Sequence, residues 1–459
     1  MMADVKGFGA VGDGVADDSD AIQHAVDQGD GSLELPGGAY RLSRPIVIEL
    51  RRTGPFSLTG GGGRARLLMA GPGPALRVVG THDKSADPEF FREGVWARER
   101  MPTVASIEVV GEHDEADGIE LEGTMQATLG GVSIRRCRYG VHLVKRNRNV
   151  IIADSHIYHG RGAAIGVYFD GVNLHQTNIV GCHISYCKHA GIKIARSEIR
   201  NLQITGCDIE YNFDPANPDS ADVWIDSRLG TVREGTISSC TIQAKYSPNG
   251  SNIRIEGPEL DDSRGAGLWA ITGNILQSQA VALRLINCRG IAATGNSFAQ
   301  CFDRSIAIDH CRNVLIGSST FDRNPDYTGQ VVDGITVRRS VGISLTGLIL
   351  DDSRAGTPEL GAAIEVFDTR EVNITGCQLL DPLHRGIELT NVRHARVTDC
   401  TVVDRRETPT MMDAIRLIGE SQDNIVSNNL VSRGRASDLT IPPGTATASG
   451  NVISERPGR

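Results

Sequence analysis

The sequence predicts an all-β protein, a single-stranded parallel β-helix of about 12 coils with a capping helix at its N-terminal end. Three observations support this fold class. A short phrase of alternating apolar and polar residues recurs along most of the chain. Most copies turn a corner at Gly, Cys or Asn, and a helical segment stands near the beginning of the chain.

The clearest copy of the repeat is residues 372–389, VNITGCQLLDPLHRGIEL. A first strand leads to a corner at Gly376-Cys377, a second strand follows, and a loop leads to a third strand at residues 386–389. The shortest spacing between copies is about 22–23 residues, which is typical of stacked coils. One coil cannot bury its inward side chains alone, so successive coils are expected to pair as parallel strands.

The same corner accounts for most of the cysteines. Six cysteines share one repeat position with three asparagines, namely Cys137, Cys182, Cys207, Cys240, Cys377, Cys400, Asn274, Asn296 and Asn428. Free cysteine behaves as a small buried hydrophobe. No CxxC pair or zinc-type spacing is present in the sequence. We therefore predict an internal ladder of reduced thiols.

Composition limits the function. A chain of 459 residues with 53 glycines and 5% aromatics suits many tight corners around a narrow interior. The net charge of −9 argues against nucleic acid as a partner. No apolar run is long enough for a membrane span. Without a visible signal peptide, the ten cysteines predict a cytoplasmic location, unless a leader has been removed.

We expect one domain with four parts. Residues 1–45 form the N-terminal cap and opening segment, and residues 46–127 the first coils, with an inserted loop at 81–101. Residues 128–435 form the regular β-helix, and residues 436–459 a last partial coil and tail. A helix is predicted at residues 19–26, strands at 33–35 and 40–42, and a helical turn at 88–93.

The opening segment resembles that of the pectate-lyase-like superfamily. The matching residues are Phe8-Gly9-Ala10-Val11-Gly12-Asp13-Gly14, Asp17-Asp18, Ala21-Ile22, Leu35-Pro36-Gly37-Gly38 and Tyr40. The superfamily includes pectate lyases, polygalacturonase-type hydrolases, mannuronan epimerases and phage tailspikes. The resemblance implies a right-handed β-helix that binds a polymer along the sheet of third strands. The three aspartates are expected to be turn and cap residues.

The middle coils present a polar patch on the outward side of their third strands. Lys193, Trp224, Arg254 and Arg284 fall on consecutive coils, a line of cations interrupted by an aromatic ring. This pattern suits an acidic carbohydrate chain, and long loops such as residues 211–220 border it. The alternative is an ordinary surface with Asp226–Arg254 and Glu256–Arg284 ion pairs.

Two reactions fit this patch. In β-elimination from a uronic acid, a base removes the proton beside the carboxyl group while a cation, or Ca²⁺ on Asp170, Asp226 and Glu256, neutralises that group. In hydrolysis, carboxylates such as Asp226 and Glu256 flank the bond. The predicted catalytic residues are Lys193, Asp226, Arg254, Glu256, Tyr168 and His189. The predicted substrate-binding residues are Trp224, Arg284, Asp170, Asp309, Tyr211 and His159.

Residues 211–215, YNFDP, resemble the YGFDPH catalytic segment of mannuronan epimerases, but Asn212 replaces Gly and Ala216 stands where His is required. The sequence as a whole favours an enzyme that cleaves an acidic poly- or oligosaccharide by β-elimination. A glycoside hydrolase or transglycosidase is the alternative. A sugar epimerase and a non-catalytic glycan-binding or tailspike protein are minor ones. The sequence predicts no definite cofactor. It is compatible with either a homotrimer or a monomer.

Overall fold

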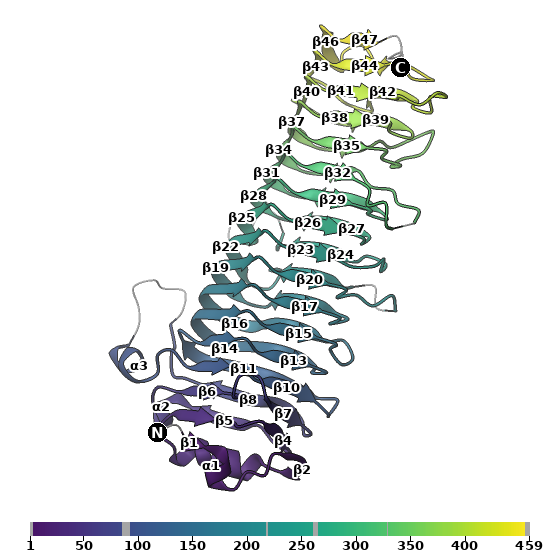
Figure 1. Ribbon diagram of the computed structural model, residues 1–459. Coiled ribbons are helices and arrows are strands. Elements are labelled where there is room, and N and C mark those ends of the chain that lie inside the picture. Colours follow the sequence, from purple (N-terminus) through teal and green to yellow (C-terminus); the bar gives the residue numbers. More distant parts are fainter. Residues whose placement is uncertain (1–2, 85–91, 217–218, 260–264, 328, 455–459) are drawn as a thin grey trace. The chain divides into compact units, whose positions relative to one another are not determined.

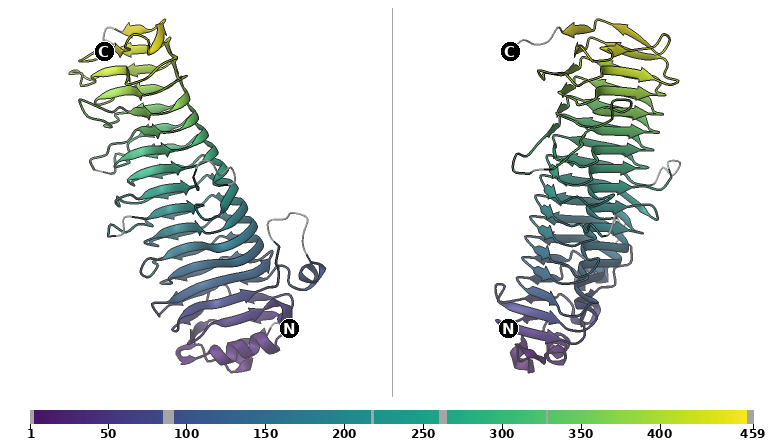
Figure 2. Two further views of the ribbon diagram at one scale, coloured as in Figure 1. Left: turned by 180° about the vertical axis from the view of Figure 1, so that it is seen from behind. Right: turned by 90° about the vertical axis from the view of Figure 1, so that its right-hand side faces the viewer.

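The computed structural model describes residues 3–84, 92–216, 219–259, 265–327 and 329–454. The chain divides into two compact units, an N-terminal unit of residues 1–241 and a C-terminal unit of residues 242–459. Within each unit, short strands of successive coils stack as parallel rungs (Figure 1). Figure 2 shows the same stacking from two other sides. The predicted parallel β-helix is therefore confirmed.

Each coil contributes to two sheets. The first sheet holds the predicted third strands and the first strands that follow them, and the second sheet holds the predicted second strands. In the N-terminal unit the first sheet comprises β1 (Ala3–Asp4), β3 (Ser32–Glu34), β5 (Ile46–Glu49), β6 (Ser57–Thr59), β8 (Gly73–Val79), β9 (Thr103–Ala105), β11 (Ala116–Met125), β12 (Thr128–Gly130), β14 (Tyr139–Ala153), β16 (Ile165–Val180), β18 (Ala190–Ala195), β19 (Glu198–Thr205), β21 (Ala221–Asp226) and β22 (Thr231–Ser238). The second comprises β2 (Asp13–Asp17), β4 (Gly38–Leu42), β7 (Ala65–Met69), β10 (Glu108–Gly111), β13 (Ser133–Arg135), β15 (His156–Tyr158), β17 (His183–Ser185) and β20 (Asp208–Glu210). Strand β23 (Thr241–Gln243) falls at the division between the units.

The C-terminal unit repeats this arrangement. Its first sheet comprises β24 (Ser251–Glu256), β25 (Gly267–Thr272), β27 (Val281–Ile286), β28 (Arg289–Thr294), β30 (Arg304–Asp309), β31 (Arg312–Gly317), β33 (Ile335–Arg338), β34 (Val341–Thr346), β36 (Ile364–Phe367), β37 (Arg370–Thr375), β39 (Arg385–Thr390), β40 (Arg396–Thr398), β42 (Asp413–Ile418), β43 (Asn424–Ser427), β45 (Leu439–Thr440) and β46 (Ala446–Ser449). Its second sheet comprises β26 (Ile275–Gln277), β29 (Ser297–Ala299), β32 (Thr320–Asp322), β35 (Ile349–Asp351), β38 (Gln378–Leu380), β41 (Thr401–Val403), β44 (Leu430–Ser432) and β47 (Val452–Ser454).

The chain makes about 15 turns, more than the 12 or so expected. Coils are already present in the early part of the chain, where strands such as β5 and β8 pair in register. These coils lack the Gly-Cys corner that marks the later ones, so the repeat could not be counted there from the sequence.

Helices are few. Among the described residues they are the 3-10 turn η1 (Val5–Phe8), α1 (Ser19–Gln28), α2 (Leu50–Thr53) and α3 (Glu93–Arg98). Apart from its last two residues, the turn predicted at 88–93 lies outside the described residues. No helix among the described residues has the length and apolar character that a membrane crossing requires.

Helix α1 lies at the N-terminal end of the stack, as predicted for a cap (Figure 1). It buries Ile22, Ala25 and Val26 against the first coils. The Asp17 carboxylate accepts hydrogen bonds from the Ser19 amide (3.1 Å) and hydroxyl (2.6 Å) at the start of the helix. The N-cap position itself is Asp18, whose side chain makes no capping hydrogen bond, so Asp17 binds the first helical residue from one position earlier.

All ten cysteines are buried and free, as the corner ladder predicts. Burial raises the pKa of the Cys137 and Cys187 thiols to about 12. The ladder position predicted at Asn428 belongs to Asn429, one residue later. The Asn429 side chain accepts a hydrogen bond from the amide of Cys400, the ladder residue of the preceding coil, at 2.9 Å. Asn428 instead takes the left-handed corner itself, with φ 56°.

Native protein is expected to resist thiol labelling, because each cysteine is at most 3% exposed. A maleimide reagent followed by mass spectrometry should modify few cysteines in buffer and nearly all ten in urea. Rapid labelling of most thiols in the native state would contradict the buried ladder.

Candidate active site

The outward column predicted on the third strands is present in the N-terminal unit. Strand pairing places Glu120, His142, Tyr168, Lys193 and Trp224 side by side on β11, β14, β16, β18 and β21. The alternate residues of the same strands point inward and are fully buried, as for Ile192 and Val223. Sequence reasoning missed Glu120 because the regular repeat was expected to begin only after it.

His142 lies between two carboxylates. Its Nδ1 is 3.4 Å from Glu120 Oε2, its Nε2 is 3.3 Å from Asp170 Oδ2, and its ring stacks on Tyr168 at a centroid distance of 5.4 Å. Burial opposes protonation, but the two carboxylates outweigh it and raise the pKa of His142 to about 8. At neutral pH this histidine is therefore a cation at the centre of the column.

Stability should consequently fall at alkaline pH. Because the folded pKa of about 8 exceeds the ordinary 6.5, the contribution of His142 is complete below about pH 6.5 and is lost as the pH rises through about 8. Its full size is roughly 2 kcal/mol. Urea titrations at about pH 6 and about pH 9 measure the difference, and His142→Gln should remove most of it. An unchanged pH dependence in that variant would contradict this assignment.

Lys193 and His189 form a close pair. Lys193 Nζ lies 2.7 Å from His189 Nε2 and 4.0 Å from the centroid of the Trp224 ring, and the His189 and Trp224 rings are 5.4 Å apart. Trp224 was predicted to be an exposed stacking surface, and this is wrong. It lies on the outer side of its strand but is only 4% exposed, because Lys193 and His189 cover it.

Tyr168 and Asp170 are joined by Arg196. The Arg196 guanidinium donates a hydrogen bond to Tyr168 Oη (3.2 Å) and forms an ion pair with Asp170. Burial, then the charge of Asp170, raises the pKa of Tyr168 to about 12. Tyr168 is therefore a neutral phenol, poorly suited to act as the base, and it is buried rather than exposed.

The two carboxylates predicted to flank the glycosidic bond, Asp226 and Glu256, each form an ion pair with an arginine. Asp226 accepts two hydrogen bonds from the Arg228 guanidinium (2.8 and 2.7 Å) and one from the Arg228 backbone amide (3.2 Å). In the C-terminal unit, Arg254 Nη2 lies 2.6 Å from Glu256 Oε1, and both side chains are buried rather than exposed as predicted. Each of these two carboxylates thus has an arginine close to it in the sequence as a partner.

The residues suggested for Ca²⁺ do not fit a metal site. Asp170, Asp226 and Glu256 are each paired with an arginine. Among the described residues, no three His, Cys, Asp or Glu side chains converge as metal binding requires. The carboxylate oxygens are thus committed to guanidinium groups.

An arginine-rich cavity opens on the third-strand side of the C-terminal unit. It has a volume of about 470 Å³, and its charged lining residues are Arg284, Arg304, Arg338, Asp303 and Asp309. Arg284 Nε lies 3.2 Å from Ser251 Oγ. Burial raises the pKa of Asp303, against the effect of Arg284 and Arg304.

Neighbouring side chains hold the charged residues of this cavity in place. Arg304 Nη2 is 3.0 Å from Glu365 Oε1, and the Arg338 guanidinium lies over the Phe367 ring at 5.3 Å. Asp309, a predicted binding residue, accepts a hydrogen bond from Arg339 Nε at 3.0 Å. The predicted residues Arg284 and Asp309 therefore share one cavity. Arg338, which alternation places in the same outward column as Asp309, also lines it, and Arg304 is an addition that sequence reasoning missed.

The predicted binding residues His159 and Tyr211 belong to an aromatic stack. They follow β15 and β20, and Tyr186, which follows β17, lies between them. The ring centroids are 4.7 Å apart for His159 and Tyr186 and 5.5 Å apart for Tyr186 and Tyr211. All three have left-handed backbone at equivalent corners. The epimerase-like segment thus begins at a corner and not on a third strand, as expected.

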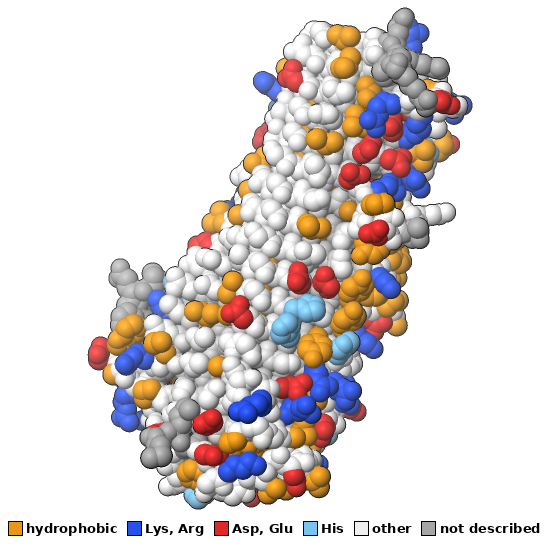
Figure 3. Space-filling view, viewed as in Figure 1, with side chains coloured by type: hydrophobic (Ala, Val, Ile, Leu, Met, Phe, Trp, Pro, Cys, Tyr) orange, Lys and Arg blue, Asp and Glu red, His pale blue; other side chains and the backbone are white. Residues whose placement is uncertain are grey.

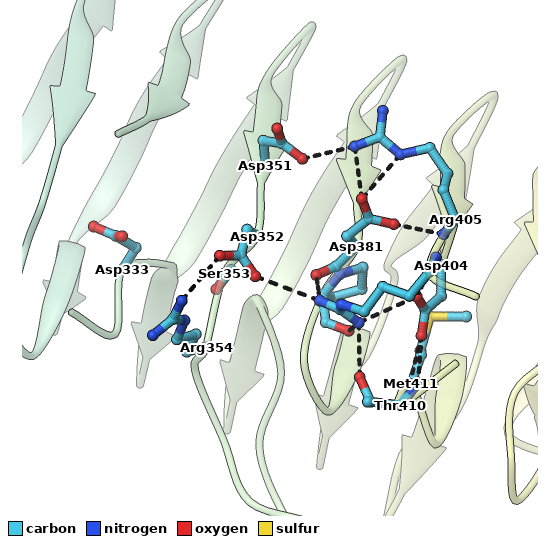
Figure 4. Close-up of polar contacts among 12 residues, drawn as sticks. Asp333, Asp351, Asp352, Ser353, Arg354, Asp381, Asp404, Arg405, Thr410 and Met411 are labelled. Carbon is cyan, nitrogen blue, oxygen red and sulfur yellow. Dashed lines mark hydrogen bonds and ion pairs between the residues drawn. The ribbon is translucent and has the colours of Figure 1, made fainter. Parts of the chain in front are cut away.

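A second charged cluster lies in the C-terminal unit, over β35, β38 and β41 (Figure 3). Arg405 Nη2 bridges Asp351 (2.9 Å) and Asp381 (2.7 Å), and Asp404 accepts from the backbone amides of Thr410 and Met411 (Figure 4). Burial opposes ionisation, but Arg405 holds the pKa of Asp381 below its usual range. These groups pair with one another and fasten a loop, so we assign the cluster a structural role.

Comparison with known proteins gives the family. A family model described as the right-handed β-helix region matches residues 92–226 and 271–453. A second one, described as rhamnogalacturonase A/epimerase, pectate lyase-like, matches residues 2–68. The first match alone covers more than half of the chain.

Curated relatives match only a short stretch. A segment of 47 residues is 54% identical to mannuronan C5-epimerase AlgE5 and 53% identical to alginate lyase 7, both of Azotobacter vinelandii. Each match covers 9% of this chain, and 5% and 6% of those relatives.

Solved structures share the fold. Pre-mature bacteriophage phi29 gene product 12 has a TM-score of 0.61 and 16% identity, covering 97% of this chain and 56% of that one. Its N-terminal fragment has a TM-score of 0.52 and 16% identity, over 96% and 71%. The tailspike gp49 of Pseudomonas phage LKA1 has a TM-score of 0.50 and 13% identity, over 98% and 84%.

At these identities the structural likeness shows the fold alone. The family matches, the parallel register of the coils and the helix at the N-terminal end all indicate a right-handed β-helix. The chain belongs to the right-handed parallel β-helix proteins of the pectate-lyase-like superfamily.

Proposed function

We propose that this protein acts on uronic-acid polysaccharides by removing the proton beside the sugar carboxylate, the first step of β-elimination. The observation that carries the proposal is the Lys193–His189 pair, whose nitrogens lie 2.7 Å apart on the third-strand side. Two nitrogens at this distance share a proton, so the pair can take one up or release one. Both side chains are partly exposed, so a bound sugar can reach them.

The chemistry of the step balances as follows. The pair takes the proton from C5 of a uronate, and the electrons of that C–H bond form the C4=C5 double bond. The C4–O bond breaks, and its electrons pass to the leaving sugar oxygen, which is then protonated. Negative charge builds on the carboxylate, so a nearby cation is needed. Arg196, which is exposed, lies three residues beyond Lys193 and also pairs with Asp170, is the candidate.

The arginine-lined cavity of the C-terminal unit also favours an acidic substrate. Three arginines line one cavity there with two aspartates. Guanidinium groups bind carboxylates well, because their planar donors match both oxygens. We assign this cavity to carboxylate groups of the same class of polymer.

The hydrolase alternative is weaker. It needs two carboxyl groups that face one glycosidic bond, one of them able to give a proton. Arg228 lowers the pKa of Asp226, although burial opposes this effect, and Arg254 neutralises Glu256. Glu120 and Asp170 have the His142 ring between them.

C5 epimerisation is a second candidate. The short similarity to mannuronan C5-epimerases and to an alginate lyase favours it. Both reactions begin with removal of the same proton. They differ in the next step, because an epimerase returns a proton to the opposite face of the sugar and leaves the chain intact.

One assay in D₂O tests the proposal. The protein is incubated with mannuronan and with polygalacturonate, while ultraviolet absorbance, reducing ends and deuterium incorporation are followed. Rising absorbance with new reducing ends indicates the lyase, and deuterium at C5 in intact chains indicates the epimerase. New reducing ends without either signal, or no change in either polymer, would contradict the proposal.

A further inference from the structure

The N-terminal unit carries a second cleft, on a different run of residues from the Lys193–His189 pair. It has a volume of about 400 Å³. Its lining residues come from the later parts of β14 and β16 and from β19, and they are Asn149, Val150, Ile151, Gln176, Asn178, Asn201 and Gln203. Five of the seven carry side-chain amides.

A shared backbone kink shapes this cleft. Asn149, Gln176 and Asn201 take the same place in three successive coils, directly after residues that pair in register. All three have left-handed backbone, with φ of 54°, 63° and 56°. Asparagine tolerates this conformation, but for glutamine it is strained. Each strand therefore bends at the same point, and the bends align into a concave surface.

Four of the five amide side chains of the cleft are not used within the described part of the protein. Asn201 Nδ2 lies 3.2 Å from His175 Nε2. In the part of the chain that the structure describes, the side chains of Asn149, Gln176, Asn178 and Gln203 make no hydrogen bond. The Asn149 Oδ1 atom is buried without a partner, which is uncommon for a buried polar atom.

The lining indicates the class of ligand. None of the seven lining residues is charged. Of the basic residues just before them, Arg148 is only 8% exposed, and Arg200 Nη1 donates to the carbonyl oxygens of Ile199 (2.9 Å) and Thr231 (3.0 Å). Amides supply both donors and acceptors, as hydroxyl groups do, and Ile151, which is 39% exposed, offers an apolar contact.

We propose that this cleft binds a neutral, hydroxyl-rich saccharide through its amide side chains. Successive coils present the amides about 4.8 Å apart, a regular ladder suited to an extended sugar chain. The site differs from the proposed acidic-sugar site in residues, charge and ligand, so the inference does not rest on the proposed function.

Calorimetric titration tests the proposal. The probes are mannohexaose, cellohexaose and xylohexaose, with hexamannuronate as the acidic counterpart. At least one neutral hexasaccharide should bind, and the double variant Asn178→Ala/Gln203→Ala should weaken its binding at least about tenfold. Asn173→Ala is the matched control, because this β16 amide lies outside the cleft and bonds to Glu198 at 2.7 Å. Its affinity should stay within about twofold of wild type.

Three results would overturn the proposal. In the first, none of the three neutral sugars binds at millimolar concentration. In the second, a neutral sugar binds but the double variant binds it as well as wild type does. In the third, the double variant loses more affinity for hexamannuronate than for the neutral sugar. A Lys193→Met variant should bind the neutral sugar as wild type does. Its result separates failure at this cleft from failure of the acidic-sugar site.

Discussion

Replacing Lys193 by methionine is expected to lower the turnover rate on the uronate polymer about a thousandfold. A positioned base contributes roughly 10²–10⁴ to such a reaction. Methionine keeps the apolar stem over the Trp224 ring but removes the nitrogen that lies 2.7 Å from His189. The rate at saturating polymer, followed by ultraviolet absorbance or by deuterium uptake, measures the effect.

Lys188→Met is the matched control, because Lys188 is exposed and lies in the loop just before β18. It should turn over at the wild-type rate, and both variants should keep the wild-type unfolding midpoint. Asp226→Asn and Glu256→Gln should each lose less than about tenfold in rate, because their carboxylates are held by arginines. A Lys193→Met variant within threefold of wild type would remove the pair from the mechanism. A loss of several orders of magnitude in the two acid variants would instead restore the hydrolase.

The fold was predictable because the repeat is periodic. The corner phrase sets the alternation of inward and outward residues, and the observed pairing of Lys193 with Trp224 and of Arg254 with Arg284 follows from aligning the copies. The count of turns was not predictable in the same way. Early strands such as β8 (Gly73–Val79) pair in register without a Gly-Cys corner, so their order appears only in three dimensions.

The site was only partly predictable, because the contacts that define it come from loops and from changes of direction. Alternation places Trp224 on the outer side of β21, but it does not reveal that His189, from the preceding loop, covers the indole ring. Arg228 and Arg196 lie just beyond the ends of β21 and β18 and turn back to Asp226 and Asp170. Alternation within strands therefore did not predict these two ion pairs.

Replacing Arg385 by methionine is expected to destabilise the C-terminal unit locally by about 3–5 kcal/mol, because it removes one member of a buried ion-paired network. The Arg385 side chain is 2% exposed, its Nε lies 2.8 Å from Asp413 Oδ2, and its Nη1 donates to the Thr357 carbonyl oxygen at 3.0 Å. The Asp413 carboxylate is 4% exposed and would keep only its hydrogen bond from Thr440 Oγ1 (2.6 Å) among these contacts.

Hydrogen–deuterium exchange is the suitable measurement, since coils of a solenoid can open separately. Amides of β39 and β42 should exchange much faster in the variant, while those of β27 and β30 stay near the wild-type rate. Arg354→Met is the control, because Arg354 is 44% exposed, pairs with Asp352 at 3.3 Å and should be worth less than about 1 kcal/mol. Adding Asp413→Asn to Arg385→Met should recover part of the loss, because the buried charge disappears with its partner. Equal exchange in the Arg385 and Arg354 variants would show that the buried network does not hold these coils together.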